Sequence, residues 1–296
     1  MLPHSHQLIA CVIALTTTVC ALVAGEDTAP RDLSGWGRVF DPSRDCEIAL
    51  DHELDRLRIT VPGTPHVLSA EAPTLPMNAP RVVNWVRGDF SAEVRVLGRL
   101  EPGRVKTTYY DPYHGAGLLI WQDASNYLRL ERAVGFINGR RQPYINYEMR
   151  ERGQLAVSRG IITKDRSLFL KLQRQGVAYS AWYSRDGRRW VELGTIEATF
   201  AERVEVGVVA VNSSKRKLSA ELERLSVNDP QGSMARDYGD HDSEKPTPPP
   251  PAPREGPPIL PSPTSGRTEP GSGQSRSEYH DPLTTPGIRW DIVGST

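Results

Sequence analysis

Short segments with alternating apolar and polar side chains follow one another along most of the chain. In Phe90–Leu97, Ala92, Val94 and Val96 share one face, and Glu93 and Arg95 share the other. A period of two is typical of a strand with one buried face. Gly, Pro, Asn and Asp separate the segments at the intervals of a β-sandwich or barrel. Strands are predicted at Cys46–Leu50, Leu57–Val61, Arg81–Val86, Phe90–Leu97, Gly117–Trp121, Tyr127–Ala133, Tyr144–Met149, Leu168–Arg174, Ala178–Ser184, Val191–Ile196, Val204–Val211 and Leu218–Val227.

Two details of this pattern are specific enough to test. Leu128 and Leu130 alternate with Tyr127 and Arg129, so Tyr127 is predicted on the face opposite the core. In the last segment the apolar phase shifts after Leu222, which predicts a β-bulge near Glu223-Arg224.

Both ends of the chain differ from this pattern. Residues Leu8 to Val23 form an apolar run that is short for a bilayer and is followed by small residues, although only His4 and His6 precede it. We interpret 1–25 as a secretory signal peptide, with an uncleaved membrane anchor as the alternative. Export to the periplasm, cell surface or medium follows, and no stable membrane insertion is expected after removal of the signal.

Residues 231–296 are predicted to be a disordered proline-rich tail. Ten of the eighteen residues from Pro246 to Pro263 are proline, and the rest is rich in Ser, Gly, Thr and charge. The closing segment Gly287–Val293 is a small apolar island that could dock on the domain or on another chain. The folded domain is therefore assigned to 26–230.

The equal numbers of basic and acidic residues argue against a nucleic-acid partner. The 296 residues carry 36 basic and 36 acidic side chains, so no overall field attracts nucleic acid, and we expect no nucleic-acid partner. Short basic groups such as Arg140-Arg141 are interpreted as solvated loop charges. Cys11 and Cys20 fall in the predicted signal, which leaves Cys46 alone, interpreted as a small packed hydrophobe.

Candidate catalytic carboxylates are few. Two sets of carboxylates share a strand face or a turn: Asp51, Glu53 and Asp55, and Glu221 with Glu223. A glycosidase needs two carboxyl groups at a defined separation. Both sets are interpreted as solvated side chains, since exposed carboxylates are ordinary on half-buried strands. We expect no catalytic residue, metal or cofactor.

Aromatic side chains gather in the central third of the chain. Aromatic rings beside amides and carboxylates offer a sugar a flat apolar face and fixed hydrogen-bond partners. The alternative is that the rings pack as strand residues and that Asp and Asn form turns. The residues predicted to contact carbohydrate are Trp121, Asp123, Asn126, Tyr127, Tyr144 and Tyr147.

Four segments carry a resemblance to a known family. Gly88–Val96, Ala116–Arg132, Tyr183–Trp190 with its Asp186-Gly187 turn, and Val206–Ser214 are together similar to the regulation-of-enolase-like family, a concanavalin-A-like domain of unknown function numbered 1349. The resemblance covers roughly residues 34 to 228. It implies an antiparallel two-sheet jelly-roll sandwich, related in architecture to lectins and to family 16 glycosidases. It implies no catalytic motif.

These observations predict an all-β sandwich that acts as an exported glycan-binding or cell-surface interaction module, with a polysaccharide or surface glycan as its partner. A glycoside hydrolase or lyase of the same fold is the first alternative, and a structural surface protein without a small ligand is the second. The sequence leaves the ligand, a calcium requirement and the oligomeric state open.

Overall fold

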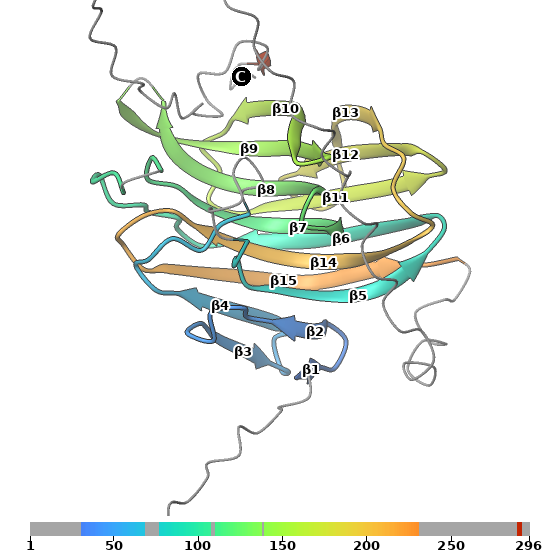
Figure 1. The fold of residues 1–296 in the computed structure, drawn as a ribbon, viewed down its shortest axis with the longest axis horizontal. Coiled ribbons are helices and arrows are strands. Elements are labelled where there is room, and N and C mark those ends of the chain that lie inside the picture. Colours follow the sequence, from blue (N-terminus) through green and yellow to red (C-terminus); the bar gives the residue numbers. More distant parts are fainter. Residues whose placement is uncertain (1–30, 69–76, 108–109, 138, 231–288, 292–296) are drawn as a thin grey trace, which may run out of the picture.

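A computed structural model describes residues 31–68, 77–107, 110–137, 139–230 and 289–291. The described residues form strands and connecting loops without a helix (Figure 1). The strands are β1 (Asp32–Leu33), β2 (Gly37–Phe40), β3 (Glu47–Asp51), β4 (Arg56–Val61), β5 (Arg81–Arg87), β6 (Phe90–Leu97), β7 (His114–Asp123), β8 (Asn126–Ile137), β9 (Arg140–Glu151), β10 (Gln154–Ile162), β11 (Leu168–Gln175), β12 (Ala178–Ser184), β13 (Val191–Glu197), β14 (Arg203–Asn212), β15 (Leu218–Asn228) and β16 (Arg289–Asp291).

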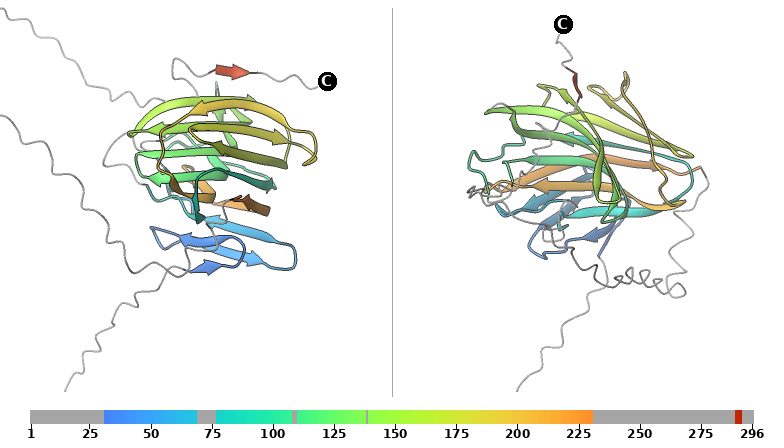
Figure 2. Two further views of the ribbon diagram at one scale, coloured as in Figure 1. Left: turned by 90° about the vertical axis from the view of Figure 1, so that its right-hand side faces the viewer. Right: turned by 45° about the horizontal axis from the view of Figure 1, so that its top comes forward.

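Two sheets stack face to face, as Figure 2 shows from the side. The nine-stranded sheet has the order β1-β2-β5-β14-β7-β8-β9-β10-β16, and the seven-stranded sheet has the order β13-β12-β11-β6-β15-β4-β3. The main core lies between them and contains the alternating side chains that the sequence pattern placed inside, such as Val94, Val96 and Leu130. The predicted all-β, two-sheet antiparallel sandwich is confirmed.

Most strands begin or end within a few residues of their predicted bounds. β6 and β12 coincide with the predicted Phe90–Leu97 and Ala178–Ser184. The register between β15 and β6 shifts between Glu223 and Ser226, and Arg224 has a positive φ of 56°, which confirms the predicted bulge. β10 was missed because Ser158, Arg159 and Gly160 interrupt its apolar alternation.

The outer face of the nine-stranded sheet carries a second apolar cluster. Val67 and Leu68, from the connection after β4, lie over Leu119, Tyr127 and neighbouring side chains of the sheet. His66 and Asn212 form an isolated antiparallel bridge that holds this connection against the end of β14. This face is therefore partly covered by the chain itself.

The short strand β16 extends the sheet beyond β10. It runs parallel to β10, with Arg289, Trp290 and Asp291 opposite Arg159, Gly160 and Ile161. Figure 2 shows this strand in red above the sandwich. Three residues of the apolar island, Arg289–Asp291, thus pair with the domain, and the rest of the island lies outside the described residues. The predicted signal peptide 1–25 and the rest of the predicted tail 231–296 lie outside the described residues. In the described part of the chain, no helix is long and apolar enough to span a bilayer.

Candidate functional site

The aromatic surface predicted from the sequence centres on Tyr127. Tyr127 lies on the face opposite the main core, as its alternation predicts, but its side chain is fully buried in the second apolar cluster. Its hydroxyl donates to the Leu68 carbonyl oxygen at 2.9 Å, and its ring stacks on Trp121 with centroids 5.5 Å apart. The guanidinium of Arg81 covers Trp121 at 4.4 Å. The expectation of a half-exposed face here is wrong, because a segment distant in sequence covers it.

The other predicted carbohydrate contacts are also engaged within the chain. Tyr147 points into the main core and donates to the Tyr179 carbonyl oxygen at 2.7 Å. Tyr144 is buried, with its ring edge against Tyr113. Carbohydrate contact by Tyr127, Tyr144 and Tyr147 stays a prediction that would require these side chains to leave their packing.

Asp123 and Asn126 form the turn between β7 and β8. Asp123 accepts hydrogen bonds from the Ser125 backbone N–H at 2.7 Å and from the Asn126 amide at 3.0 Å. The Asn126 side-chain oxygen accepts from the Arg152 backbone N–H. These contacts agree with the turn-forming alternative. Both side chains remain partly exposed at the end of the hairpin.

Beside Tyr127, the same face of β8 and β9 carries a buried network of charges. Arg129 lies 2.9 Å from Glu148 and 3.4 Å from Glu131, and Arg150 lies 3.0 Å from Glu148. Tyr113 donates its hydroxyl to Glu131 at 2.7 Å. Two arginines and two glutamates balance in charge, which is the condition under which buried charges are tolerated.

The two glutamates of this network have pKa values displaced in opposite directions. Burial raises the pKa of Glu131, and Arg129 only partly opposes this effect. Burial acts in the same direction on Glu148, but Arg129 and Arg150 outweigh it and lower its pKa to about 2. Two carboxyl groups with separated pKa values are the chemical basis of acid–base pairs in hydrolases. Here both side chains are fully buried.

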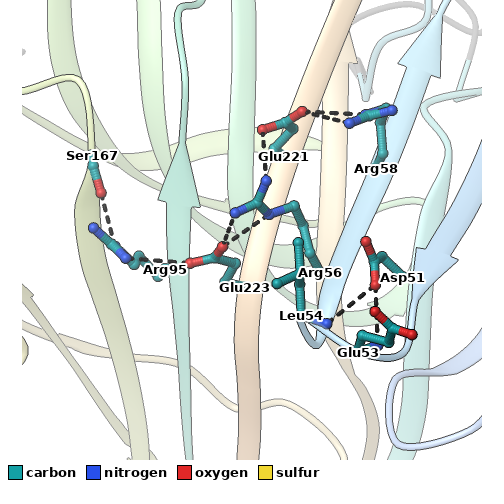
Figure 3. A network of polar contacts seen from close by, with 9 residues as sticks. All are labelled: Asp51, Glu53, Leu54, Arg56, Arg58, Arg95, Ser167, Glu221 and Glu223. Atoms are coloured by element: carbon teal, nitrogen blue, oxygen red, sulfur yellow. Dashed lines mark hydrogen bonds and ion pairs between the residues drawn. The ribbon is translucent and has the colours of Figure 1, made fainter.

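Of the carboxylates singled out from sequence, those of Asp51, Glu221 and Glu223 are held in ordinary structural contacts (Figure 3). On the outer face of the seven-stranded sheet, Glu221 pairs with Arg58 at 2.9 Å, and Glu223 pairs with Arg56 and with Arg95. In the turn after β3, Asp51 accepts backbone hydrogen bonds from residues 53 and 54. The carboxylate of Asp55 accepts from the Trp36 indole at 2.9 Å. Glu221 and Glu223 are joined through Arg56, so both carboxylates serve ion pairs on the outer face of the sheet.

A cavity of about 200 Å³ lies at one end of the sandwich. Segments distant in sequence form its wall: the turn after β6, the inner sides of β8 and β9, and the connection from β10 to β11. Leu100, Val134 and Pro143 supply its apolar part. Its polar residues are Arg99, Glu101, Arg132, Arg141, Lys164 and Arg166. Sequence reasoning missed this site, because no single segment carries more than three of its residues.

Arg132 is the buried polar residue of the cavity. β8 places it on the side that faces the other sheet, between the core residues Leu130 and Val134 of the same strand face. Its Nε donates to the Asp165 carbonyl oxygen at 3.0 Å, while its Nη1 is buried without a hydrogen-bond partner among the described residues. Burial lowers the pKa of Arg132 to about 10. The group remains charged at neutral pH.

Cys46 lies in a small cluster that the sequence did not predict. The ligand atoms of Asp45, Cys46 and His66 all lie within 4.8 Å of one another. His66 Nε2 is 2.7 Å from Asp45 Oδ1, and its Nδ1 is 3.0 Å from the Thr64 carbonyl oxygen. Burial, with Asp41 and Asp45 adding to it, raises the pKa of the Cys46 thiol. The thiol is therefore protonated, which agrees with a packing role.

Comparison with protein-family models finds no match, and comparison with curated proteins finds none either. The resemblance to the regulation-of-enolase-like family therefore stays a prediction. Among solved structures, a functionally unknown protein from Saccharomyces cerevisiae is similar, with a TM-score of 0.54 and 14% identity over 66% of this chain and 97% of that one. The likeness shows the fold alone.

Two further solved structures are less similar. The carbohydrate-binding module CBM66 from Bacillus subtilis has a TM-score of 0.41 and 14% identity, covering 67% of this chain and 99% of that chain. The GH43 protein BlXynB from Bacillus licheniformis has a TM-score of 0.42 and 17% identity, and the match covers 58% of this chain and 32% of that one. The two sheets themselves show the β-sandwich, and the ligand is left to be inferred from the geometry of the site.

Proposed function

We propose that this chain is an exported, non-catalytic binding module whose ligand is the terminal unit of a glycan, held in the cavity at the end of the sandwich. The cavity is the observation that supports the proposal. Its volume of about 200 Å³ is below the roughly 300–1,000 Å³ of sites for drug-sized ligands, so it suits one ring rather than a long chain.

The chemistry of the wall agrees with a saccharide. Leu100, Val134 and Pro143 provide an apolar surface for the C–H face of a sugar ring, and the surrounding guanidinium and ammonium groups provide hydrogen-bond donors for its oxygens. One acid, Glu101, lines the cavity, and it is paired with Arg99 at 2.6 Å and Arg216 at 3.3 Å. Glycosidase chemistry uses two carboxyl groups at the bond that breaks, so this wall favours binding over hydrolysis.

A glycoside hydrolase is the second candidate function, and the opposite pKa displacements of Glu131 and Glu148 favour it. Against it, both carboxylates are fully buried and bonded to Arg129 or Tyr113, so no substrate reaches them in this arrangement. Incubation with any bound glycan, followed by analysis of reducing ends, tests this alternative. Release of sugar by the chain, lost in Glu131→Gln, would replace binding with hydrolysis as its function.

A glycan array probed with the full-length chain tests the binding proposal. We expect binding to a set of glycans that share one terminal unit. Pro143→Trp should abolish it, because the larger side chain would occupy the cavity at whose edge the half-buried Pro143 lies. Val191→Trp is the matched control, since Val191 is exposed on the other sheet and lies outside the cavity.

Loss of glycan binding in both tryptophan variants, or in neither, would contradict the assignment of the cavity. A folded chain that binds no glycan would instead favour a structural surface protein without a small ligand. Export is supported by the apolar run from Leu8 to Val23 followed by small residues. An intact Met1 on cytoplasmic protein from the native host would contradict it.

A further inference from the structure

The cavity wall carries an excess of positive charge. Five basic residues line it, namely Arg99, Arg132, Arg141, Lys164 and Arg166, against the single acid Glu101. Glu101 is shared between Arg99 and Arg216, so it neutralises at most its own neighbours at the rim. Across the whole chain the two signs are equal in number, which makes this local excess a feature of the site and not of the protein.

Among the described residues, the other four bases of the wall form no side-chain ion pair within 4 Å, although the Asp165 carboxylate lies near enough to Arg132 to act on its pKa. The Arg141 guanidinium donates to the Pro102 carbonyl oxygen at 2.9 Å, and Arg132 donates to the Asp165 carbonyl oxygen. Both partners are neutral backbone groups. The carboxylate of Asp165 accepts hydrogen bonds from Arg185 at 2.9 Å and from the Thr163 hydroxyl at 2.8 Å. Lys164 and Arg166 are exposed and form no ion pair with a described residue.

Three arginines on the outer face of the seven-stranded sheet provide a comparison within the same chain. Arg56, Arg58 and Arg95 are each within ion-pair distance of Glu221 or Glu223 (Figure 3). There the three arginines share the two glutamates of the neighbouring strand, and each guanidinium has a carboxylate within ion-pair distance. At the cavity, four bases form no direct ion pair with a described acid, and one of them, Arg132, is almost fully buried with Nη1 unbonded among the described residues.

We infer that the glycan unit bound in this cavity is acidic, and that its carboxylate or sulfate group is held by Arg132 and by the rim bases Lys164 and Arg166. This inference rests on the proposed function and specifies its ligand. A planar guanidinium recognises a carboxylate or sulfate through paired N–H donors, and such charge-assisted bonds are stronger than neutral ones. An anion at this position supplies the acceptor that the buried Nη1 lacks and offsets the charge that the wall concentrates.

Titration calorimetry on the full-length chain tests the inference with three matched saccharides. The probes are an oligosaccharide ending in a uronic acid, the same oligosaccharide with its carboxyl group reduced to an alcohol, and a sulfated counterpart. Inorganic sulfate is the fourth probe. We expect the uronate or the sulfated sugar to bind about tenfold or more tightly than the reduced form. The preference should shrink as salt is added, because the rim charges are exposed.

Three variants identify the residues. Arg132→Gln should remove most of the preference for the acidic sugar. Lys164→Gln should weaken it severalfold, and this exposed position keeps the test valid if Arg132→Gln does not fold. Arg58→Gln, an exposed arginine of the other sheet, is the control and should leave binding unchanged.

Each remaining outcome is decisive. Equal binding of the uronate and its reduced form would overturn the acidic-ligand inference while leaving glycan binding intact. Binding of inorganic sulfate, lost in Lys164→Gln, but of no saccharide would contradict the proposed function and support the anion site alone. An unchanged preference in both cavity variants would place the anion elsewhere and overturn the inference.

Discussion

Replacing Arg129 by Met should destabilise the fold strongly, because this residue joins the two buried glutamates of the network on β8 and β9. Its guanidinium lies 2.9 Å from Glu148 and 3.4 Å from Glu131, and 9% of its side chain is exposed. Met fills a similar volume without charge. The variant keeps Arg150 beside Glu148 but leaves Glu131 without a nearby cation.

The magnitude follows from the burial of the partners. Removing one member of a buried ion pair costs about 3–5 kcal/mol, because the remaining charge is left uncompensated. A typical domain is stable by only about 5–15 kcal/mol, so the loss would be a large fraction of the total. The matched control is Arg58→Met. Arg58 also pairs with a glutamate at 2.9 Å, but 55% of its side chain is exposed. An exposed pair of this kind contributes about 0–1 kcal/mol.

Urea denaturation followed by tryptophan fluorescence measures both variants. We expect a lower midpoint for Arg129→Met at an unchanged slope, and a midpoint near wild type for Arg58→Met. The double variant Arg129→Met/Glu131→Gln should recover part of the loss, since a neutral amide oxygen at position 131 can still accept from Tyr113 and Asn146. If Arg129→Met and Arg58→Met lose equal stability, the buried network does not carry the energy assigned to it.

Three further predictions concern the rest of the fold. Tyr127→Phe should cost about 1 kcal/mol in urea denaturation by removing the buried bond to the Leu68 carbonyl, and a stability equal to wild type would refute that bond. Deleting residues 230–296 should speed amide exchange at Gly160 and Ile161, where β16 pairs, with little change in melting temperature; unchanged exchange would contradict the pairing. Acid should destabilise the fold through Glu148: its pKa is depressed to about 2, so its contribution is present above pH 4.5 and lost as pH falls toward 2. Glu148 therefore predicts a loss of stability over that window, whereas the effect of Glu131, whose pKa is raised by burial, falls above pH 4.5, where its contribution is lost as pH rises; a stability that stays constant or increases as pH falls from 4.5 to 2 would contradict the prediction.

The sequence predicted what depends on local alternation. The strand Phe90–Leu97, the bulge after Glu223 and the face on which Tyr127 lies all follow from side-chain periodicity, which acts over a few residues. The sequence did not predict that Tyr127 is covered, because the covering residue Leu68 is 59 positions away.

The candidate site was missed for a similar reason. Arg141 belongs to the pair Arg140-Arg141, which composition alone favours as solvated loop charge. Arg141 lines the cavity only because Leu100 and Lys164, which belong to other parts of the chain, lie close to it in the fold. Periodicity places a side chain on a face of a strand, but it does not specify which distant segments meet at the end of the sandwich.

Hydrogen-exchange mass spectrometry with and without a bound glycan tests the central claim most directly, because it reports where the ligand lies on the chain. The cavity assignment predicts slower exchange at residues 99–101, 132–134 and 164–166, and unchanged exchange in the β7–β8 turn at Asp123–Asn126. Protection of that turn, with the cavity segments unchanged, would contradict the assignment and return the site to the predicted aromatic surface.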